Sequence, residues 1–167
     1  MSAPSVIARI GDTTLAFALA EVREVLLDVD VRPVPLAPPV IAGLVNLRGE
    51  VLTAVDGPLL LGLRPSPPPG GPAQVVLRGP GAGRSLIVDE VLAVRPIDDA
   101  PTQAPPPNLN PALVEVASSL VLLGDQLTVR IDGRALIARL LAAVSPPATA
   151  AGGPHPPTAQ DAALERR

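Results

Sequence analysis

Short apolar runs separated by glycine, proline and polar residues make up most of the chain, a pattern that predicts many short β-strands. The runs consist largely of Val, Ile and Leu, and the β-branched members favour extended backbone. In the first part of the chain they predict strands at 5–10, 13–18, 29–34, 44–47 and 51–55. In the second part they predict strands at 74–77, 85–88, 91–94, 114–123 and 126–131.

Two segments show the spacing of helices instead. Leu19, Val22, Val25 and Leu26 recur on one helical face, which predicts one or two helical turns over 20–25. The stronger signal covers 134–143, where Asp132 is well placed as the N-cap. The apolar stripe of this second helix consists of Leu136, Ile137, Leu140, Leu141 and Val144.

Proline-rich stretches separate these elements. Residues 64–72 hold five prolines and two glycines, so we expect a mobile surface loop there. This loop divides the strands into two groups, which suggests two small barrels that share one core within a domain of residues 1–144. Residues 98–111 form a second proline-rich connection. Residues 145–167 are dominated by Ala, Gly and Pro, and we expect a disordered tail.

Polar residues interrupt the apolar pattern most sharply within 43–56, between two predicted strands. Asn46 is expected to satisfy local backbone groups. Gly43 and Gly49 are expected to allow positive φ or close backbone approach. Arg48 has two interpretations, because a guanidinium is costly to desolvate without a partner. It either hydrogen-bonds backbone carbonyls where the strands meet or serves as a recognition point.

Composition restricts the possible chemistry. The chain has no Cys, Lys, Tyr or Trp, and its only histidine, His155, lies in the Gly/Pro-rich tail. A thiolate nucleophile, a Schiff-base lysine and a phosphate-binding lysine are therefore excluded. A structural zinc site would need more Cys or His. We expect no enzymatic activity, no cofactor and no metal site.

One enzymatic alternative stays open at this point. Asp56 and Asp89 each follow an apolar strand, and two carboxylates can perform acid–base chemistry when their pKa values differ. Aspartates at strand ends more often form turns or caps. A small β-barrel enzyme that uses this pair and a ligand-binding β-barrel module are thus the two alternatives to a protein-interaction role.

Charge and hydropathy limit the kinds of partner that the chain is expected to bind. The net charge is −3, and the 13 cationic residues are all arginines that are scattered along the chain. Without a basic stripe or stacking aromatics, we expect no nucleic-acid binding. No apolar run reaches about 18 residues, and no signal segment is recognisable, so we expect a cytoplasmic protein without membrane insertion.

Four segments resemble, in order, the CheW family of adaptor proteins of bacterial chemosensory arrays. Residues 43–56 are similar to its Asn-Leu-Arg-Gly signature, and this is the most specific match. Residues 22–25 resemble its Val-x-Glu-Ile element, 86–91 its Val-Asp-x-Val element, and 127–140 its closing strand and helix. The resemblance covers about 5–144. It implies two five-stranded SH3-like β-barrels packed together, with a C-terminal helix.

The resemblance also implies a function. Members of the family are non-enzymatic scaffolds that link the cytoplasmic tip of chemoreceptors to the regulatory domain of a CheA-type histidine kinase. The implied partner-binding residues are Val22, Glu24, Val25, Asn46, Arg48 and Gly49, with Val25 in an apolar groove between the barrels. Gly43, Asp56, Asp89 and Asp132 are expected to be structural.

Four residues depart from the family pattern. Thr53 stands where the family has proline, Gly57-Pro58 stands where Leu-Arg is common, and Ala18 stands where Asp is frequent. These departures leave the identity of the partners open.

Overall fold

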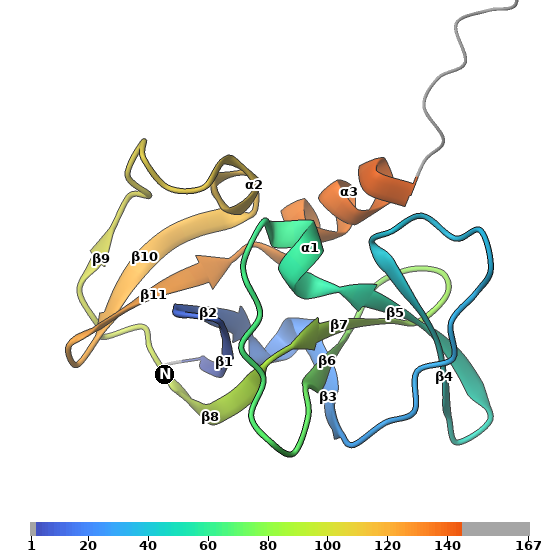
Figure 1. Ribbon diagram of the computed structural model, residues 1–167. Helices are drawn as coiled ribbons and strands as arrows, with labels where there is room; N and C mark the ends of the chain where they lie inside the picture. The colour runs from blue at the N-terminus through green and yellow to red at the C-terminus, as the bar shows by residue number, and fades with distance from the viewer. Residues whose placement is uncertain (1–2, 145–167) are drawn as a thin grey trace, which may run out of the picture.

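The computed structural model describes residues 3–144, which form a mainly β structure of two sheets (Figure 1). Sheet A has the strand order β8-β1-β2-β11-β10-β9. Its strands are β1 (Pro4–Ile10), β2 (Thr13–Ala18), β8 (Glu90–Pro96), β9 (Thr102–Gln103), β10 (Ala117–Leu123) and β11 (Gln126–Ile131). Sheet B has the order β3-β6-β7-β5-β4. Its strands are β3 (Val22–Leu27), β4 (Ile41–Leu47), β5 (Glu50–Asp56), β6 (Ala73–Leu77) and β7 (Arg84–Val88).

Helices are short except for the last one. The described residues include a 3₁₀ turn η1 (Leu19–Glu21), α1 (Gly57–Leu61), α2 (Pro111–Val114) and α3 (Gly133–Val144). Asp132 caps α3 as predicted, since its Oδ1 accepts hydrogen bonds from the Arg134 and Ala135 amides at 2.9 and 3.1 Å. The predicted strand 114–123 is shorter than expected, because α2 occupies its beginning.

Apolar side chains fill three clusters. The largest lies between the sheets and includes Phe17 of β2, Val75 of β6 and Leu136 of α3. A second cluster, around Val45 and Leu52, belongs to sheet B alone, and a third joins residues of β1, β2 and β10 in sheet A. Both sheets therefore bury side chains on two faces, so the predicted shared core is present.

The prediction that loop 64–72 separates the two groups of strands is wrong, because strands before and after the loop belong to the same sheet. The chain enters sheet B after β2 and returns to sheet A after β7, so the loop connects α1 to β6, a strand of sheet B (Figure 1). The predicted strand 91–94 is present within β8, which belongs to sheet A because it pairs with β1. A proline-rich loop marks an exposed connection, whereas strand pairing decides sheet membership.

Of the expected pair of five-stranded barrels, the structure shows the two sheets. Sheet A has six strands, the sixth being the two-residue β9. In sheet B the outermost strands are β3 and β4, and the loop after β3 reaches β4 through an isolated bridge between Arg32 and Leu44. Closure of either sheet into a barrel stays a prediction.

Two predicted elements between residues 19 and 34 are wrong. The helix over 20–25 is the 3₁₀ turn η1 followed by β3, whose pairing with β6 contains a register shift between Val22 and Glu24. This shift makes strand residues recur with an irregular spacing that imitates a helix. The strand at 29–34 is reduced to the single bridge of Arg32, because the segment has several prolines nearby.

The proline-rich loop 64–72 lies on the surface, as predicted, with most of its residues exposed. It is tied to the rest of the molecule where the Ser66 amide donates a 2.6 Å hydrogen bond to Asp89. Among the helices of residues 3–144, none has the length and apolar content needed to cross a bilayer.

Candidate partner-binding surface

The Asn46–Gly49 segment forms a tight turn between β4 and β5. Leu47 and Glu50 are the last paired residues, so Arg48 and Gly49 alone make the turn. Their φ angles are 53° and 87°, and a type I′ turn requires positive φ at both positions. The Asn46 Oδ1 accepts a hydrogen bond from the Gly49 amide at 2.9 Å, so the predicted local role of Asn46 is present.

The Arg48 side chain contacts Glu24 of β3. Its Nη2 lies 2.8 Å from the Glu24 Oε2, and its side chain is 74 % exposed while that of Glu24 is 23 % exposed. The prediction that Arg48 hydrogen-bonds backbone carbonyls is therefore wrong, because its partner is the carboxylate of Glu24. Instead, Arg48 joins the β4–β5 turn to β3, the strand at the opposite end of sheet B.

Two further charges extend this contact, and sequence patterns did not single them out. The Arg23 Nη2 lies 2.6 Å from the Glu50 Oε2, and the Arg23 Nε lies 3.7 Å from the Glu24 Oε1. The hydrogen bond to Glu50 raises the pKa of Arg23, and in return Arg23 lowers the pKa of Glu50. Along the sequence, these four residues alternate between positive and negative charge, in two short groups at 23–24 and 48–50. This alternation was the signal from which sequence analysis could have found Arg23 and Glu50.

Apolar side chains accompany the charges on the same hairpin. Asn46 pairs with Val51 and Leu44 pairs with Thr53, so these residues share one face of β4–β5. Val51 is 56 % and Leu44 is 38 % exposed. We call the set Arg23, Glu24, Leu44, Asn46, Arg48, Glu50 and Val51 the Arg48 surface. Glu50 pairs with Leu47 on the other face of the hairpin, so the aliphatic and the charged members of this surface lie on its two faces, around the same turn.

Two residues predicted to contact a partner are placed elsewhere. Val22 is only 3 % exposed and lies in the core between the sheets, so it has no free surface to offer. Val25 is half-buried and packs against the same core. The register shift between Val22 and Glu24 explains this, because it places both Val22 and Val25 on the face of β3 that pairs with Leu77 and Val75 of β6.

An apolar hollow lies between the end of β6 and α3. It has a volume of about 220 Å³, and its apolar lining comes from Leu77, Gly79, Pro80 and Ile137. Glu21 borders it close to the beginning of α3. Burial raises the pKa of Glu21, and the Asp132 carboxylate adds to the rise. Val25 does not line this hollow, so the groove expected around Val25 stays a prediction.

Close backbone approach explains Gly43 and part of the unusual sequence after β5. A Cβ atom on Gly43 would lie 2.3 Å from the Arg32 carbonyl oxygen, and one on Gly57 would lie 2.1 Å from that of Ile87. The Thr53 amide donates a 2.9 Å hydrogen bond to the Gly83 carbonyl oxygen, which a proline at 53 would abolish. The structure therefore explains why this chain has threonine at 53 and glycine at 57, where the family pattern differs.

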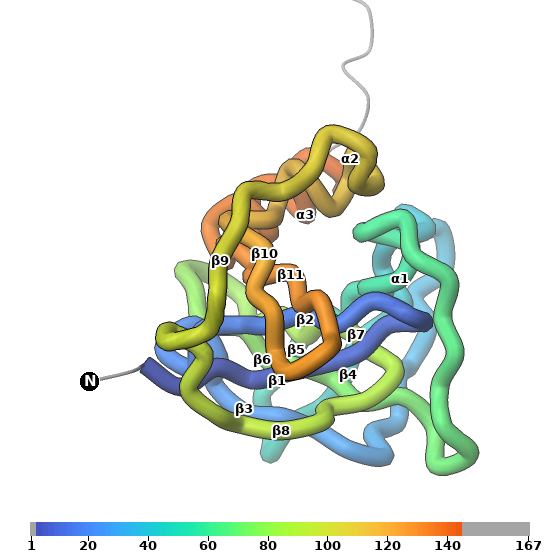
Figure 2. The backbone as a smooth tube through the Cα atoms, turned by 90° about the vertical axis from the view of Figure 1, so that its left-hand side faces the viewer, coloured from blue at the N-terminus to red at the C-terminus, as the bar shows by residue number. Residues whose placement is uncertain are grey.

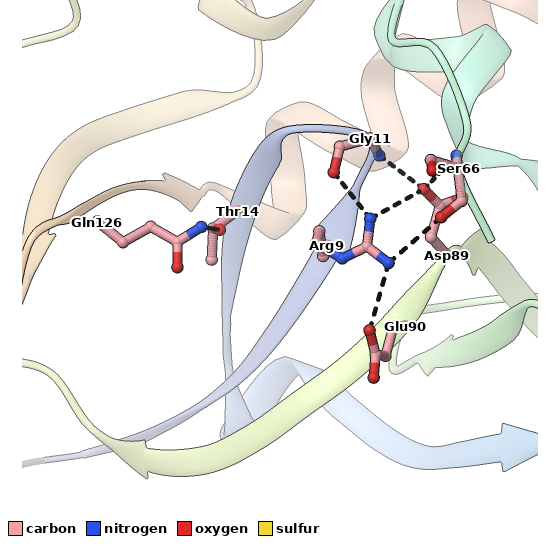
Figure 3. A network of polar contacts seen from close by, with 7 residues as sticks. All are labelled: Arg9, Gly11, Thr14, Ser66, Asp89, Glu90 and Gln126. Atoms are coloured by element: carbon pink, nitrogen blue, oxygen red, sulfur yellow. Dashed lines mark hydrogen bonds and ion pairs between the residues drawn. The ribbon is translucent and has the colours of Figure 1, made fainter. Parts of the chain in front are cut away.

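Asp56 and Asp89, the candidate carboxylate pair, bind separate backbone groups. Asp56 caps α1 by accepting the Leu59 amide at 2.8 Å. Asp89 is 2 % exposed and accepts the Gly11 and Ser66 amides, each at 2.6 Å, with the Arg9 guanidinium 3.7 Å away (Figure 3). Each carboxylate acts as a structural brace, so an enzyme that uses this pair is not supported.

Other kinds of site find little support in residues 3–144. The described part of the chain contains no group of three or more His, Cys, Asp or Glu side chains placed to hold a metal ion. A hollow of about 350 Å³ near the beginning of α3 is lined by five charged residues, Glu21, Asp98, Arg130, Asp132 and Arg134. Two of these, Arg130 and Asp98, pair with each other at 3.3 Å, so a ligand-binding module is not supported either.

Comparisons with known proteins agree with the fold. The family model described as CheW-like domain matches residues 4–141. The chain is 31 % identical over 98 residues to a chemotaxis protein CheW of Rhizobium meliloti (strain 1021), a match that spans 59 % of this chain and 63 % of the relative, just under two thirds of its length. It is also similar to the crystal structure of the scaffolding protein TtCheW from Thermoanaerobacter tengcongensis, with a TM-score of 0.68 and 24 % identity. That alignment covers 79 % of this chain and 90 % of the other.

Proposed function

Because the chain belongs to the CheW-like family, we propose that it is a non-catalytic adaptor that couples chemoreceptors to a CheA-type histidine kinase. As such it acts in the cytoplasm at receptor arrays. Its partners are the cytoplasmic tip of methyl-accepting receptors and the regulatory domain of the kinase. The family match over residues 4–141 supports this role, and so does the relative named as a chemotaxis protein.

The observation that carries the proposal is the geometry of Arg48. An arginine at positive φ is uncommon, and such positions cluster at functional sites. Its guanidinium is presented to solvent, and the Glu24 carboxylate holds it in a defined orientation. A guanidinium held in this way is prepared for a carboxylate or carbonyl partner at low entropic cost. We assign partner binding to the Arg48 surface, with Glu24 as the positioning residue.

The test is the substitution Arg48→Glu in the full chain. It places a second carboxylate beside Glu24 and removes the cation, so we expect receptor or kinase binding to weaken by at least about tenfold. The strand content should persist because the side chain is exposed. Pull-down with the receptor tip and with the kinase regulatory domain, measured separately, shows which partner uses the surface.

Arg64→Glu is the matched control. Arg64 is also exposed, and its substitution changes the net charge by the same amount. Unchanged binding of both partners by a folded Arg48→Glu protein would show that Arg48 has no recognition role. Absence of binding by the unmodified chain to either partner would refute the adaptor function itself.

A further inference from the structure

Strand β8 forms an open edge of sheet A. It is the outermost strand, and no backbone hydrogen bond joins it to any described strand other than β1. All residues from Leu92 to Pro96 are exposed, including Leu92 at 44 % and Val94 at 55 %. Figure 2 shows β8 along the lower side of the molecule, on the side that faces the viewer. Such an edge presents unpaired amide and carbonyl groups to a further strand.

A register shift orders the side chains of this edge. Glu90, Ala93 and Arg95 pair with Arg9, Ile7 and Ser5, which alternate along β1 and so share one face of the sheet. Val91 and Val94 pair with Ala8 and Val6 on the other face. In a regular strand, residues 90 and 95 would lie on opposite faces. The extra residue at the shift places them on the same face.

The charges at the two ends of the edge are complementary. Glu90 is acidic and is paired with Arg9 within the chain at 3.3 Å. Arg95 is exposed and has no ion pair among residues 3–144. When two copies of this strand align antiparallel, only one register places Glu90 opposite Arg95, and it also places Val91 opposite Val94. Both pairs then occur twice, once on each side of the two-fold axis.

We propose that β8 pairs with β8 of a second copy of this chain, forming a two-fold dimer with a continuous sheet across the interface. Two Glu90–Arg95 pairs lie on one face of the joined sheet. Two Val91–Val94 pairs lie on the other, and opposite charges directly across an antiparallel pair stabilise it. This interface uses sheet A, whereas the Arg48 surface belongs to sheet B, and the proposal does not depend on the adaptor role.

The test is sedimentation velocity of the full chain over a concentration series. We expect a reversible monomer–dimer equilibrium, and Arg95→Glu should raise the dimer dissociation constant by at least about tenfold because both cross-strand pairs become repulsive. Val94→Lys should weaken the dimer similarly without altering Glu90. The control Arg64→Glu, which changes net charge equally, should leave the constant unchanged.

A charge exchange then tests the register. Glu90→Arg alone should also be monomeric, whereas an equal mixture with Arg95→Glu should form heterodimers, since every facing pair is again of opposite charge. Circular dichroism confirms that each variant is folded, because Glu90→Arg also loses the contact with Arg9. A wild-type chain that stays monomeric at the highest soluble concentration would overturn the proposal. So would a dimer that survives both Arg95→Glu and Val94→Lys.

Discussion

Arg48 occupies a backbone position that suits glycine and asparagine better than arginine. Its φ of 53° lies in the left-handed region, where a residue with a long side chain is disfavoured by about 1–3 kcal/mol. The neighbouring Gly49, at 87°, has no such cost. The exposed pair with Glu24 contributes about 0.2–1 kcal/mol, which does not offset a cost at the upper end of that range. This balance is compatible with the recognition role proposed for Arg48.

Replacement of Arg48 by asparagine separates these two effects. Asn-Gly is the preferred pair for a type I′ turn, so we expect Arg48→Asn to raise the melting temperature by about 2–4 °C. The same substitution removes the guanidinium, and partner binding should fall. Thermal unfolding followed by circular dichroism, together with the pull-down assay, measures both. A lower melting temperature would show that the Glu24 contact outweighs the backbone cost.

At the scale of elements, Asp56 at the end of β5 and Asp89 just after β7 are expected to stabilise the molecule unequally. Asp56 caps the five-residue α1, whose first turn also holds Pro58. Asp89 joins its own segment, after β7, to two others that are distant in sequence: the end of β1 with its turn, at Arg9 and Gly11, and the proline-rich loop at Ser66 (Figure 3). The carboxylate is buried, so its removal leaves two amides without their acceptor.

We expect Asp89→Ala to lower the free energy of unfolding by about 2–4 kcal/mol, because two backbone amides and Arg9 lose their buried partner. Asp56→Ala removes one helix cap and should cost about 1 kcal/mol. Urea denaturation of both variants at neutral pH compares them directly. Equal losses would contradict the assignment of Asp89 as the link between the three segments.

At the scale of the whole molecule, one chain alternates between two sheets. Sheet B is inserted between β2 and β8 of sheet A, and the parallel pairs β2–β11 and β5–β7 join strands far apart in sequence. The core between the sheets collects residues from both, with α3 supplying Leu136 and Leu140. The two sheets therefore share one core, and we expect them to unfold together.

The composition of residues 145–167 predicts a segment that adds little to this core. These residues lie outside the part that the structure describes. We expect deletion of 145–167 to leave the melting temperature nearly unchanged, as measured by differential scanning calorimetry. A fall of about 5 °C or more would show that the tail packs on the domain.

Local patterns in the sequence determined the elements whose signals are local. The strands on either side of Arg48, the turn residues Asn46 and Gly49, and the Asp132 cap of α3 follow from propensity and side-chain chemistry within a few residues. The absence of cysteine and lysine restricted the chemistry, and the Asn-Leu-Arg-Gly segment indicated the family.

Only the tertiary structure decided which distant residues meet. The contact of Arg48 with Glu24, the burial of Val22, and the return of the chain to sheet A at β8 all depend on strand pairing between remote segments. Helical spacing at 19–26 was misleading because a register shift in β3 changed the period of its buried residues. Pairing energies arise between strands rather than within them, so sequence spacing alone does not reveal them.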